Sequence, residues 1–299
     1  SNMKKVLQIS IVVILLALVG MIFIKMVSGK SAKSDNRPIK VTKSVADKVV
    51  GESSEKAKPS TSSEQEQAKP EPKWVKSDAP IEFPILMYHH IADVVDGNTL
   101  FVPADEFKME MTALKNAGYY TLSPEEAYRV LTTNEKPAEK IVWVTFDDGY
   151  KNAHDTAMPI LTALGMKGSF FIITGKLGNE DTMTDEMLSE LKANPLMSVG
   201  SHTVNHPDLE YSSHDVANTE LIDSKKYLDN LLHQETSVIC YPAGRYNTET
   251  AGLAEAAGYK LGLTTNPGLA SSANGLFALN RVRVSYGQTE ASFMALIGN

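Results

Sequence analysis

The sequence predicts an α/β domain built as a closed or nearly closed (β/α) barrel of seven to eight strands, with an open doubly wound sheet as the alternative. Strand patterns alternate with helix patterns from about residue 81 to the C-terminus. Several strands are continuous apolar runs, such as Ile141–Phe146, as expected for strands that are covered on both faces. Repeated strand-helix units imply parallel strands that are joined by right-handed crossovers.

The strand patterns are short, apolar and rich in β-branched or aromatic residues. They are Ile85–His90, Tyr119–Leu122, Ile141–Asp147, Gly168–Thr174, Met197–His202, Ser237–Pro242, Lys260–Thr265 and Leu279–Val284. The helix patterns between them have an apolar stripe, a capping residue at the start or a glycine after the end. They are the stripe Phe107, Met111 and Leu114, the residues after Ser123-Pro124, Asp185–Ala193, Asp215–His233 and Thr248–Ala257.

Two segments are expected before this domain of residues 81–299. In residues 1–27, Ser1 and Asn2 look like a cloning remnant, and Val6–Ile24 forms an apolar run. About 19 helical residues span the roughly 30 Å core of a bilayer, so we expect a membrane anchor. A cleaved signal peptide is the alternative, although no Ala-x-Ala-like site follows. Residues 28–80 lack Leu, Met, Phe and Tyr, and we expect them to form a disordered stalk.

Charge and cysteine content exclude several classes of function. The formal net charge is −7, with a basic excess in residues 1–80 and an acidic excess in the remainder. An acidic domain argues against nucleic acid as a partner, because phosphate contacts need a basic face. The single Cys240 excludes an intramolecular disulfide and a cysteine-built zinc finger. A metal site would therefore consist of histidine and carboxylate groups, and nothing in the sequence indicates an obligate protein partner.

Polar residues that are unusual in a core follow the predicted strands. They are His89 and His90 at the end of the first strand, Asp147 and Asp148 at the end of the third, His202 at the end of the fifth with His206 just beyond it, and Arg281 in the last. In barrels and doubly wound sheets, ligands gather at the carboxyl ends of the strands. The convergence therefore predicts a divalent metal site. Taken singly, each motif is also compatible with a turn, a helix cap or a satisfied core histidine, and we expect the remaining histidines, such as His154, on the surface.

Two of these motifs resemble those of a known family. Thr145-Phe-Asp-Asp-Gly149 and His202-Thr-Val-Asn-His206 are similar to the first two motifs of the polysaccharide deacetylases, carbohydrate esterase family 4 with the NodB-homology domain. The resemblance covers about residues 85–299. It implies a distorted (β/α) barrel that removes acetyl groups from polymeric sugars with a divalent metal. It also implies Asp148, His202 and His206 as the metal ligands and Asp147 as the general base.

The sequence departs from the commonest pattern of that family. Its usual Arg-Pro-Pro-Tyr-Gly is replaced by Cys240-Tyr-Pro-Ala-Gly244, and its late Leu-x-His motif is missing. The early Tyr88-His89 resembles instead the permuted members that act on poly-N-acetylglucosamine or peptidoglycan. This resemblance implies that His89 replaces the late histidine as the general acid and that Arg281 replaces the missing arginine. His90 is the alternative acid, because neighbouring strand residues face opposite sides.

The sequence therefore predicts a metal-dependent N-deacetylase that acts on N-acetylglucosamine units of peptidoglycan or of an exopolysaccharide. Zinc is the first choice of metal, because three protein ligands leave an open position for water, and Co²⁺ and Ni²⁺ are the alternatives. The expected location is the cell membrane, with a single-pass anchor and an extracellular domain. The alternative functions are a non-catalytic module that binds wall polysaccharide and an O-acetyl esterase that acts on xylan-like polymers.

Overall fold

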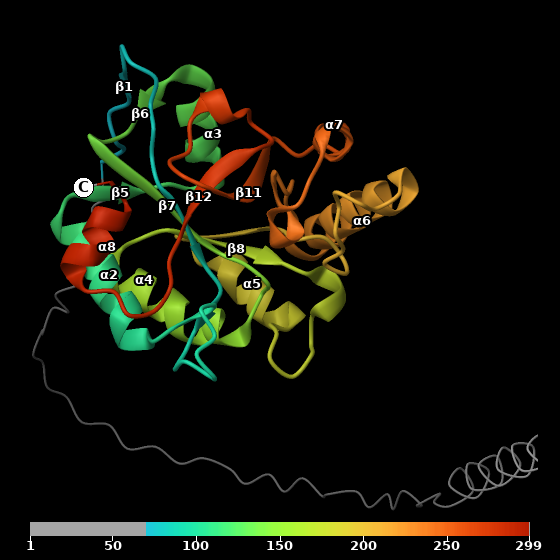
Figure 1. Ribbon diagram of the computed structural model, residues 1–299, viewed down its shortest axis with the longest axis horizontal. Helices are drawn as coiled ribbons and strands as arrows, with labels where there is room; N and C mark the ends of the chain where they lie inside the picture. Colours follow the sequence, from blue (N-terminus) through green and yellow to red (C-terminus); the bar gives the residue numbers. More distant parts are fainter. Residues whose placement is uncertain (1–69, 299) are drawn as a thin grey trace, which may run out of the picture. The chain divides into compact units, whose positions relative to one another are not determined.

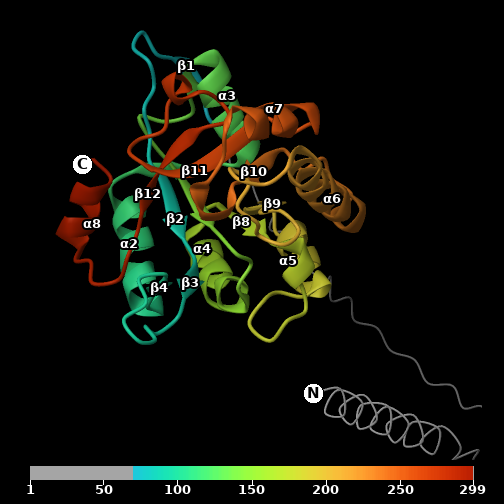
Figure 2. The ribbon, with the colours of Figure 1, turned by 45° about the vertical axis from the view of Figure 1, so that its right-hand side comes forward.

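The computed structural model describes residues 70–298, which form a barrel of parallel strands with helices on its outside (Figure 1, Figure 2). The ring runs in the order β2-β7-β8-β9-β10-β11-β12 and returns to β2. Its members are β2 (Ile85–Tyr88), β7 (Lys140–Phe146), β8 (Gly168–Ile172), β9 (Met197–Ser201), β10 (Val238–Cys240), β11 (Leu261–Pro267) and β12 (Leu279–Arg283). Because β2 pairs with both β7 and β12, the ring is closed. The barrel prediction is confirmed, and the open-sheet alternative is wrong.

One predicted strand lies outside the ring. Strand β5 (Tyr119–Thr121) pairs in parallel with Lys140–Val142 at the start of β7. The later part of β7, Trp143–Phe146, pairs with β2. Strand β5 therefore extends the sheet beside the first residues of β7, and seven of the eight predicted strands close the barrel.

The five predicted helices are present, with ends close to the expected ones. They are α2 (Ala104–Asn116), α3 (Pro124–Thr133), α5 (Asp185–Ala193), α6 (His214–Leu232) and α7 (Thr248–Ala256). Two short helices were not predicted, α4 (Met158–Leu164) and α8 (Glu290–Leu296), and α8 lies against α2 (Figure 2). Each has only seven residues, which is too few for a helical period to show in a sequence.

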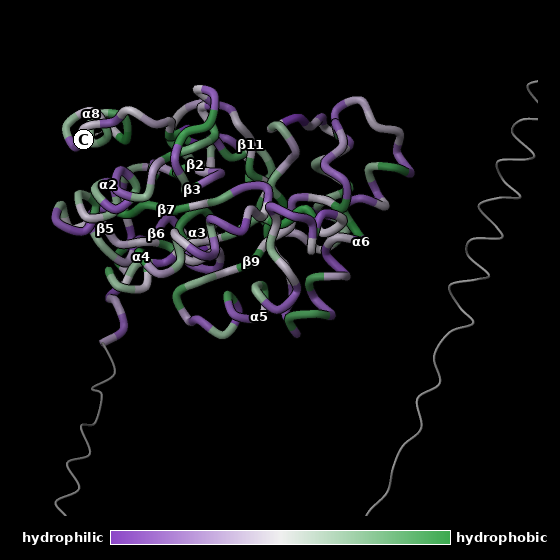
Figure 3. The backbone as a smooth tube through the Cα atoms, turned by 90° about the horizontal axis from the view of Figure 1, so that it is seen from below, coloured by the Kyte–Doolittle hydropathy of each residue, from purple (hydrophilic) through white to green (hydrophobic). Residues whose placement is uncertain are grey.

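Side-chain alternation along β7 separates two parts of the core. Val142, Val144 and Phe146 belong to the cluster that includes residues of the outer helices α2, α4 and α5. Trp143 belongs to a second cluster, and its indole N–H donates to Ser169 of β8 at 2.9 Å. Because side chains alternate along a strand, Thr145 and Asp147 follow Trp143 on the same face. The apolar stretch along β7 is visible as a green segment of the tube (Figure 3).

The packed unit begins earlier than residue 81, where the sequence placed its start. Strand β1 (Val75–Lys76) pairs with β6 (Glu135–Lys136), which follows α3. Asn134 has left-handed backbone angles, its side-chain NH₂ donates to the carbonyls of Ser77 and Ala79, and its side-chain oxygen accepts from the N–H of Ile81. These contacts fasten residues 75–81 to the barrel, so the last residues assigned to the stalk are part of the fold.

The predicted membrane anchor of residues 1–27 and most of the predicted stalk lie outside the described residues. Within residues 70–298, no helix is both long and apolar enough to cross a membrane. The short strands β3 (His90–Ile91) and β4 (Phe101–Val102) pair with each other beyond the end of β2. The sequence had placed His90 inside the first strand, but that strand ends at Tyr88, and His89 lies between the two segments.

Candidate functional site

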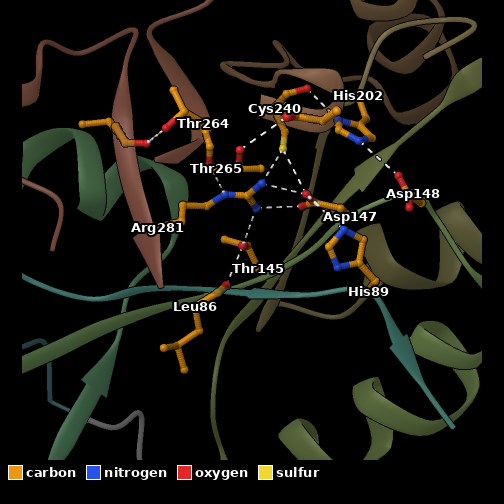
Figure 4. A network of polar contacts seen from close by, with 12 residues as sticks. Leu86, His89, Thr145, Asp147, Asp148, His202, Cys240, Thr264, Thr265 and Arg281 are labelled. Atoms are coloured by element: carbon orange, nitrogen blue, oxygen red, sulfur yellow. Dashed lines mark hydrogen bonds and ion pairs between the residues drawn. The ribbon is translucent and has the colours of Figure 1, made fainter. Parts of the chain in front are cut away.

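The polar residues at the strand ends converge, as the sequence predicts (Figure 4). The residues that meet are His89 after β2, Asp147 and Asp148 after β7, His202 and His206 after β9, Cys240 in β10 and Arg281 in β12. They form two adjoining groups. One is centred on the carboxylate of Asp147, and the other on that of Asp148.

The first group is a buried ion pair between Asp147 and Arg281. Two guanidinium nitrogens of Arg281 donate to the two carboxylate oxygens of Asp147 at 2.8 and 2.7 Å. Asp147 is 3% exposed and Arg281 1%. Burial alone would raise the pKa of Asp147, but the charge and hydrogen bonds of Arg281 hold that pKa well below its usual range. Asp147 is therefore ionised at neutral pH.

The guanidinium of Arg281 is held in place by further hydrogen bonds. Its Nε donates to the carbonyl oxygen of Thr264 at 2.7 Å, and a terminal nitrogen donates to the hydroxyl of Thr145 at 3.2 Å. The Thr145 hydroxyl donates in turn to the carbonyl of Leu86 at 2.6 Å. Arg281 thus bonds to β7 and β11 from its own strand β12 (Figure 4), which fixes the orientation of both partners of the ion pair.

Cys240 also contacts this ion pair. Its thiol donates to Asp147 at 3.4 Å, and its sulfur accepts from Arg281 at 3.2 Å. Burial raises the pKa of the thiol, so Cys240 remains protonated at neutral pH. Sequence reasoning used Cys240 only to exclude disulfides and zinc fingers. Cys240 occupies the motif position at which the family usually has arginine, and this was the one signal in the sequence that could have placed it in the site.

The second group brings Asp148, His202 and His206 together. One carboxylate oxygen of Asp148 lies 3.1 Å from Nε2 of His202 and 3.6 Å from Nε2 of His206. Within the described residues, this oxygen is buried and has no hydrogen-bond partner. Nitrogen and oxygen ligands at about 2.1 Å from a tetrahedral ion lie about 3.4 Å from one another. The three side chains therefore fit a divalent metal.

The environment of His202 favours the same conclusion. Its Nδ1 lies 2.6 Å from the carbonyl oxygen of Cys240, so Nδ1 carries the proton and donates, and Nε2 is free to bind a cation. Metal-binding histidines are commonly fixed in this way. Burial would lower the pKa of His202, but Cys240 and Asp148 raise it well above its usual value. A cation at Nε2 is thus electrostatically favoured, whether it is a proton or a metal ion.

Backbone conformation aims these side chains. Asp148, Thr203, His206 and Ala243 all have positive φ, at 75°, 67°, 59° and 51°, although none is a glycine. Such conformations cost of order 1 kcal/mol or more each and are frequent at functional sites. In an extended strand Asp148 would face away from Asp147. Its left-handed conformation, continued by Gly149 at φ 70°, ends the strand sharply and lets both carboxylates reach the site.

The structure distinguishes His89 from His90. Nε2 of His89 lies 3.8 Å from Asp147, whereas the ring of His90 is stacked between Phe101 and Tyr150 at centroid distances of 4.0 and 3.4 Å. The ring of His90 therefore has a packing role. Burial lowers the pKa of His89, although the two aspartates act in the opposite direction, so its ring is neutral at neutral pH.

Tyr88, the residue before His89, is fixed by a buried hydrogen bond to helix α2. Its hydroxyl donates to Glu110 of α2 at 2.9 Å, and both side chains are fully buried. Burial raises the pKa of Glu110 to about 8. Glu110 is therefore largely protonated at neutral pH.

The expectation for His154 is wrong. This histidine is 7% exposed and lies between Asp155 at 2.8 Å and Glu190 of α5 at 2.7 Å. It is the second residue of a π-helical turn, Ala153–Ala157, that leads into α4. The turn directs the imidazole toward α5, which a regular helical period does not predict.

Comparison with known proteins identifies the family. The family model described as polysaccharide deacetylase matches residues 134–262. The chain is 44% identical over 224 residues to YxkH of Bacillus subtilis (strain 168), a protein named as a candidate polysaccharide deacetylase, with 75% of this chain and 79% of YxkH covered. The chain belongs to the polysaccharide deacetylase family.

A solved structure and a second relative agree with this assignment. The Streptococcus pyogenes deacetylase PplD in complex with acetate is 44% identical, with a TM-score of 0.71, and the match covers 74% of this chain and all of PplD. A poly-β-1,6-N-acetyl-D-glucosamine N-deacetylase of Staphylococcus aureus (strain N315) is 26% identical over 178 residues, which cover 54% of this chain and 60% of that protein. The resemblance predicted from the two motifs is confirmed.

Proposed function

We propose that the protein is a metal-dependent N-deacetylase that removes acetyl groups from N-acetylglucosamine units of a cell-wall or extracellular polysaccharide. The observation that carries the proposal is the pairing of two carboxylates with different surroundings. The negative charge of ionised Asp147 is balanced by the guanidinium of Arg281. The buried oxygen of Asp148, in contrast, faces two histidines without a hydrogen bond. One aspartate is thus free for proton transfer and the other for metal binding.

Asp148, His202 and His206 would hold the ion. A divalent ion bound there supplies a Lewis acid that lowers the pKa of a water molecule and polarises the acetamide carbonyl. Zinc is our first choice for a site with two imidazoles and one carboxylate, with Co²⁺ and Ni²⁺ as alternatives.

Asp147 and His89 would move the protons. Asp147, ionised beside Arg281, accepts a proton from the attacking water at Oδ2, the oxygen nearest to His89. His89 delivers a proton from Nε2 to the amine as the carbon–nitrogen bond breaks. The products are acetate and a free amino group on the sugar. Because His89 is neutral at rest, it must first gain the proton that it gives to the amine. Asp147, 3.8 Å away, would pass on to His89 the proton that it took from the water.

The substrate and location are also part of this proposal. The similarity to the poly-β-1,6-N-acetyl-D-glucosamine N-deacetylase of Staphylococcus aureus favours an N-acetylglucosamine polymer. We further propose that residues 1–27 anchor the protein in the cell membrane with the deacetylase domain outside, because Val6–Ile24 is long and apolar enough to span a bilayer.

Acetate release tests the proposal. The purified protein should release acetate from peptidoglycan or poly-β-1,6-N-acetylglucosamine faster than from acetylated xylan, and chelation should abolish the release. Asp147→Asn should retain the ion but lose roughly a hundredfold or more in rate. Asp223→Asn on the exposed side of α6 is the matched control and should be fully active. Binding of polymer by both wild type and Asp147→Asn without any acetate release would instead favour a binding module.

The same assay tests His89. His89→Ala should reduce deacetylation severely with the metal retained, because Nε2 is the proton donor. His214→Ala, which removes an exposed imidazole paired with Glu249, is the control. An active His89→Ala variant would remove His89 from the mechanism.

A further inference from the structure

The loop that carries the metal ligand His206 also carries the most exposed large hydrophobic side chain of the described residues. Tyr211 is 79% exposed, compared with 56% for Val75 and 54% for Val95. It lies five positions after His206 in the loop between β9 and α6. Loops that follow the strands of a parallel barrel lie at the carboxyl ends of the strands, which is also the end that carries the site.

This loop is rigidly held on both sides of His206. Before it, the carboxylate of Glu220 accepts from the backbone N–H groups of Val204 and Asn205, each at 2.8 Å. After it, Asp208 accepts from Arg245 at 2.5 Å. The backbone that presents the metal ligand is therefore fixed by contacts with α6 and with the segment after β10.

The residues next to Tyr211 are fixed as well. The side-chain NH₂ of Asn247 donates to the carbonyl of Glu210 at 2.8 Å, and the hydroxyl of Ser212 donates to the carbonyl of Asp208 at 2.6 Å. Leu209 is buried at 1% exposure. Tyr211 thus projects from an ordered backbone, and within residues 70–298 its hydroxyl has no hydrogen-bond partner in the protein.

A fastened loop that carries a site histidine and leaves an aromatic ring in water at the same end of the barrel has the chemistry of a binding platform. A tyrosine ring gives a large apolar contact area at low entropic cost, because it has only two side-chain torsions. The C–H face of a pyranose ring is flat and apolar, and stacking it on the aromatic face removes both surfaces from water. Glu210 directly precedes Tyr211 in the chain, and its negative charge disfavours sugars that carry phosphate or uronic acid groups.

We infer that Tyr211 is a specificity-determining residue that stacks against a neutral sugar unit next to the one that is deacetylated. The inference rests on the proposed function and extends it. It makes the substrate a chain of sugars and not an isolated one. A neighbouring sugar does not change during the reaction, so stacking stabilises the ground state and the transition state equally. Removal of the ring should therefore raise KM and leave kcat unchanged.

The experiment compares a long substrate with a short one. Wild type, Tyr211→Ala and Tyr211→Phe are assayed for acetate release from N-acetylglucosamine pentamers, β-1,4-linked and β-1,6-linked, and for hydrolysis of a small aryl acetate. Withdrawal of about 60 Å² of apolar surface from water corresponds to about a tenfold change in binding affinity. We expect Tyr211→Ala to raise KM for the better pentamer about tenfold, with kcat within twofold and the aryl acetate unaffected. Tyr211→Phe, which keeps the ring, should match wild type.

Controls separate this inference from the proposed function. Tyr227→Ala removes another exposed tyrosine, on α6, whose hydroxyl bonds to Asp185, and it should have no effect on either substrate. A pentamer KM within twofold of wild type for Tyr211→Ala overturns the inference, and so does an equal loss on both substrates. If wild type releases no acetate from either pentamer or from the polymers, the proposed function fails and the inference with it.

Discussion

Replacement of Arg281 by methionine tests whether the ion pair with Asp147 carries the stability of the site. The guanidinium makes two charged hydrogen bonds to Asp147 in a region where neither side chain is more than 3% exposed. Methionine keeps much of the volume but leaves the carboxylate buried without its counter-charge. Breaking a buried pair in this way costs about 3–5 kcal/mol. For a domain of this size, 1 kcal/mol shifts the melting temperature by roughly 2–4 °C, so Arg281→Met should melt roughly 10 °C below wild type.

The assay is thermal unfolding at neutral pH, with metal content measured for each variant. The double variant Arg281→Met/Asp147→Asn removes both charges and should recover much of the loss, since no unpaired ion remains. Arg129→Met removes an exposed ion pair with Glu135 and is the control, with an expected effect of about 1 kcal/mol or less. If Arg281→Met melts within about 2 °C of wild type, or if the double variant is less stable than the single one, the reasoning is refuted.

Three further predictions concern other parts of the fold. The pKa of Glu110 is raised to about 8, so the stability that this side chain contributes is present below about pH 4.5 and is lost as the pH rises toward 8. The melting temperature of wild type should therefore fall more over this pH range than that of Glu110→Gln. Gly244→Ala would place a methyl group 2.1 Å from the Thr265 hydroxyl at φ +71° and should lower the free energy of unfolding by about 2 kcal/mol or more. Gly252→Ala in α7, where the space is open, should raise that free energy slightly. Denaturant titration compares the two variants, and equal effects would contradict the packing argument. His206→Ala should lose metal affinity, measured by competition with a chelator, but keep the fold, because the His206 side chain is 31% exposed; a purified variant with wild-type metal content would exclude His206 as a ligand.

The sequence predicted the parts of this structure that depend on local pattern. Apolar runs of the right length gave the barrel strands, and the position of Asp147 at the end of one of them placed it at the site. The pairing of Arg281 with Asp147 came from the family resemblance, since two residues so far apart share no local signal. The burial of His154 depends on a π-helical turn, and the attachment of residues 75–81 depends on Asn134. Both are tertiary effects, which side-chain periodicity does not encode.

Barrel closure joins the first strand of the ring to the last, and this gives the reaction centre a place in the order of synthesis. Strand β2 precedes Asp147 in the chain, but β12, which carries Arg281, pairs with β2 only after nearly the whole domain has been made. Domains emerge from the ribosome from the N-terminus onward. Until residues 279–283 dock, Asp147 has no guanidinium partner, and β2 and β11 each present an unpaired edge. Completion of the ion pair and closure of the barrel are therefore one event. A nascent or truncated chain without β12 lacks the Asp147–Arg281 pair and exposes two unpaired strand edges that can pair with other chains.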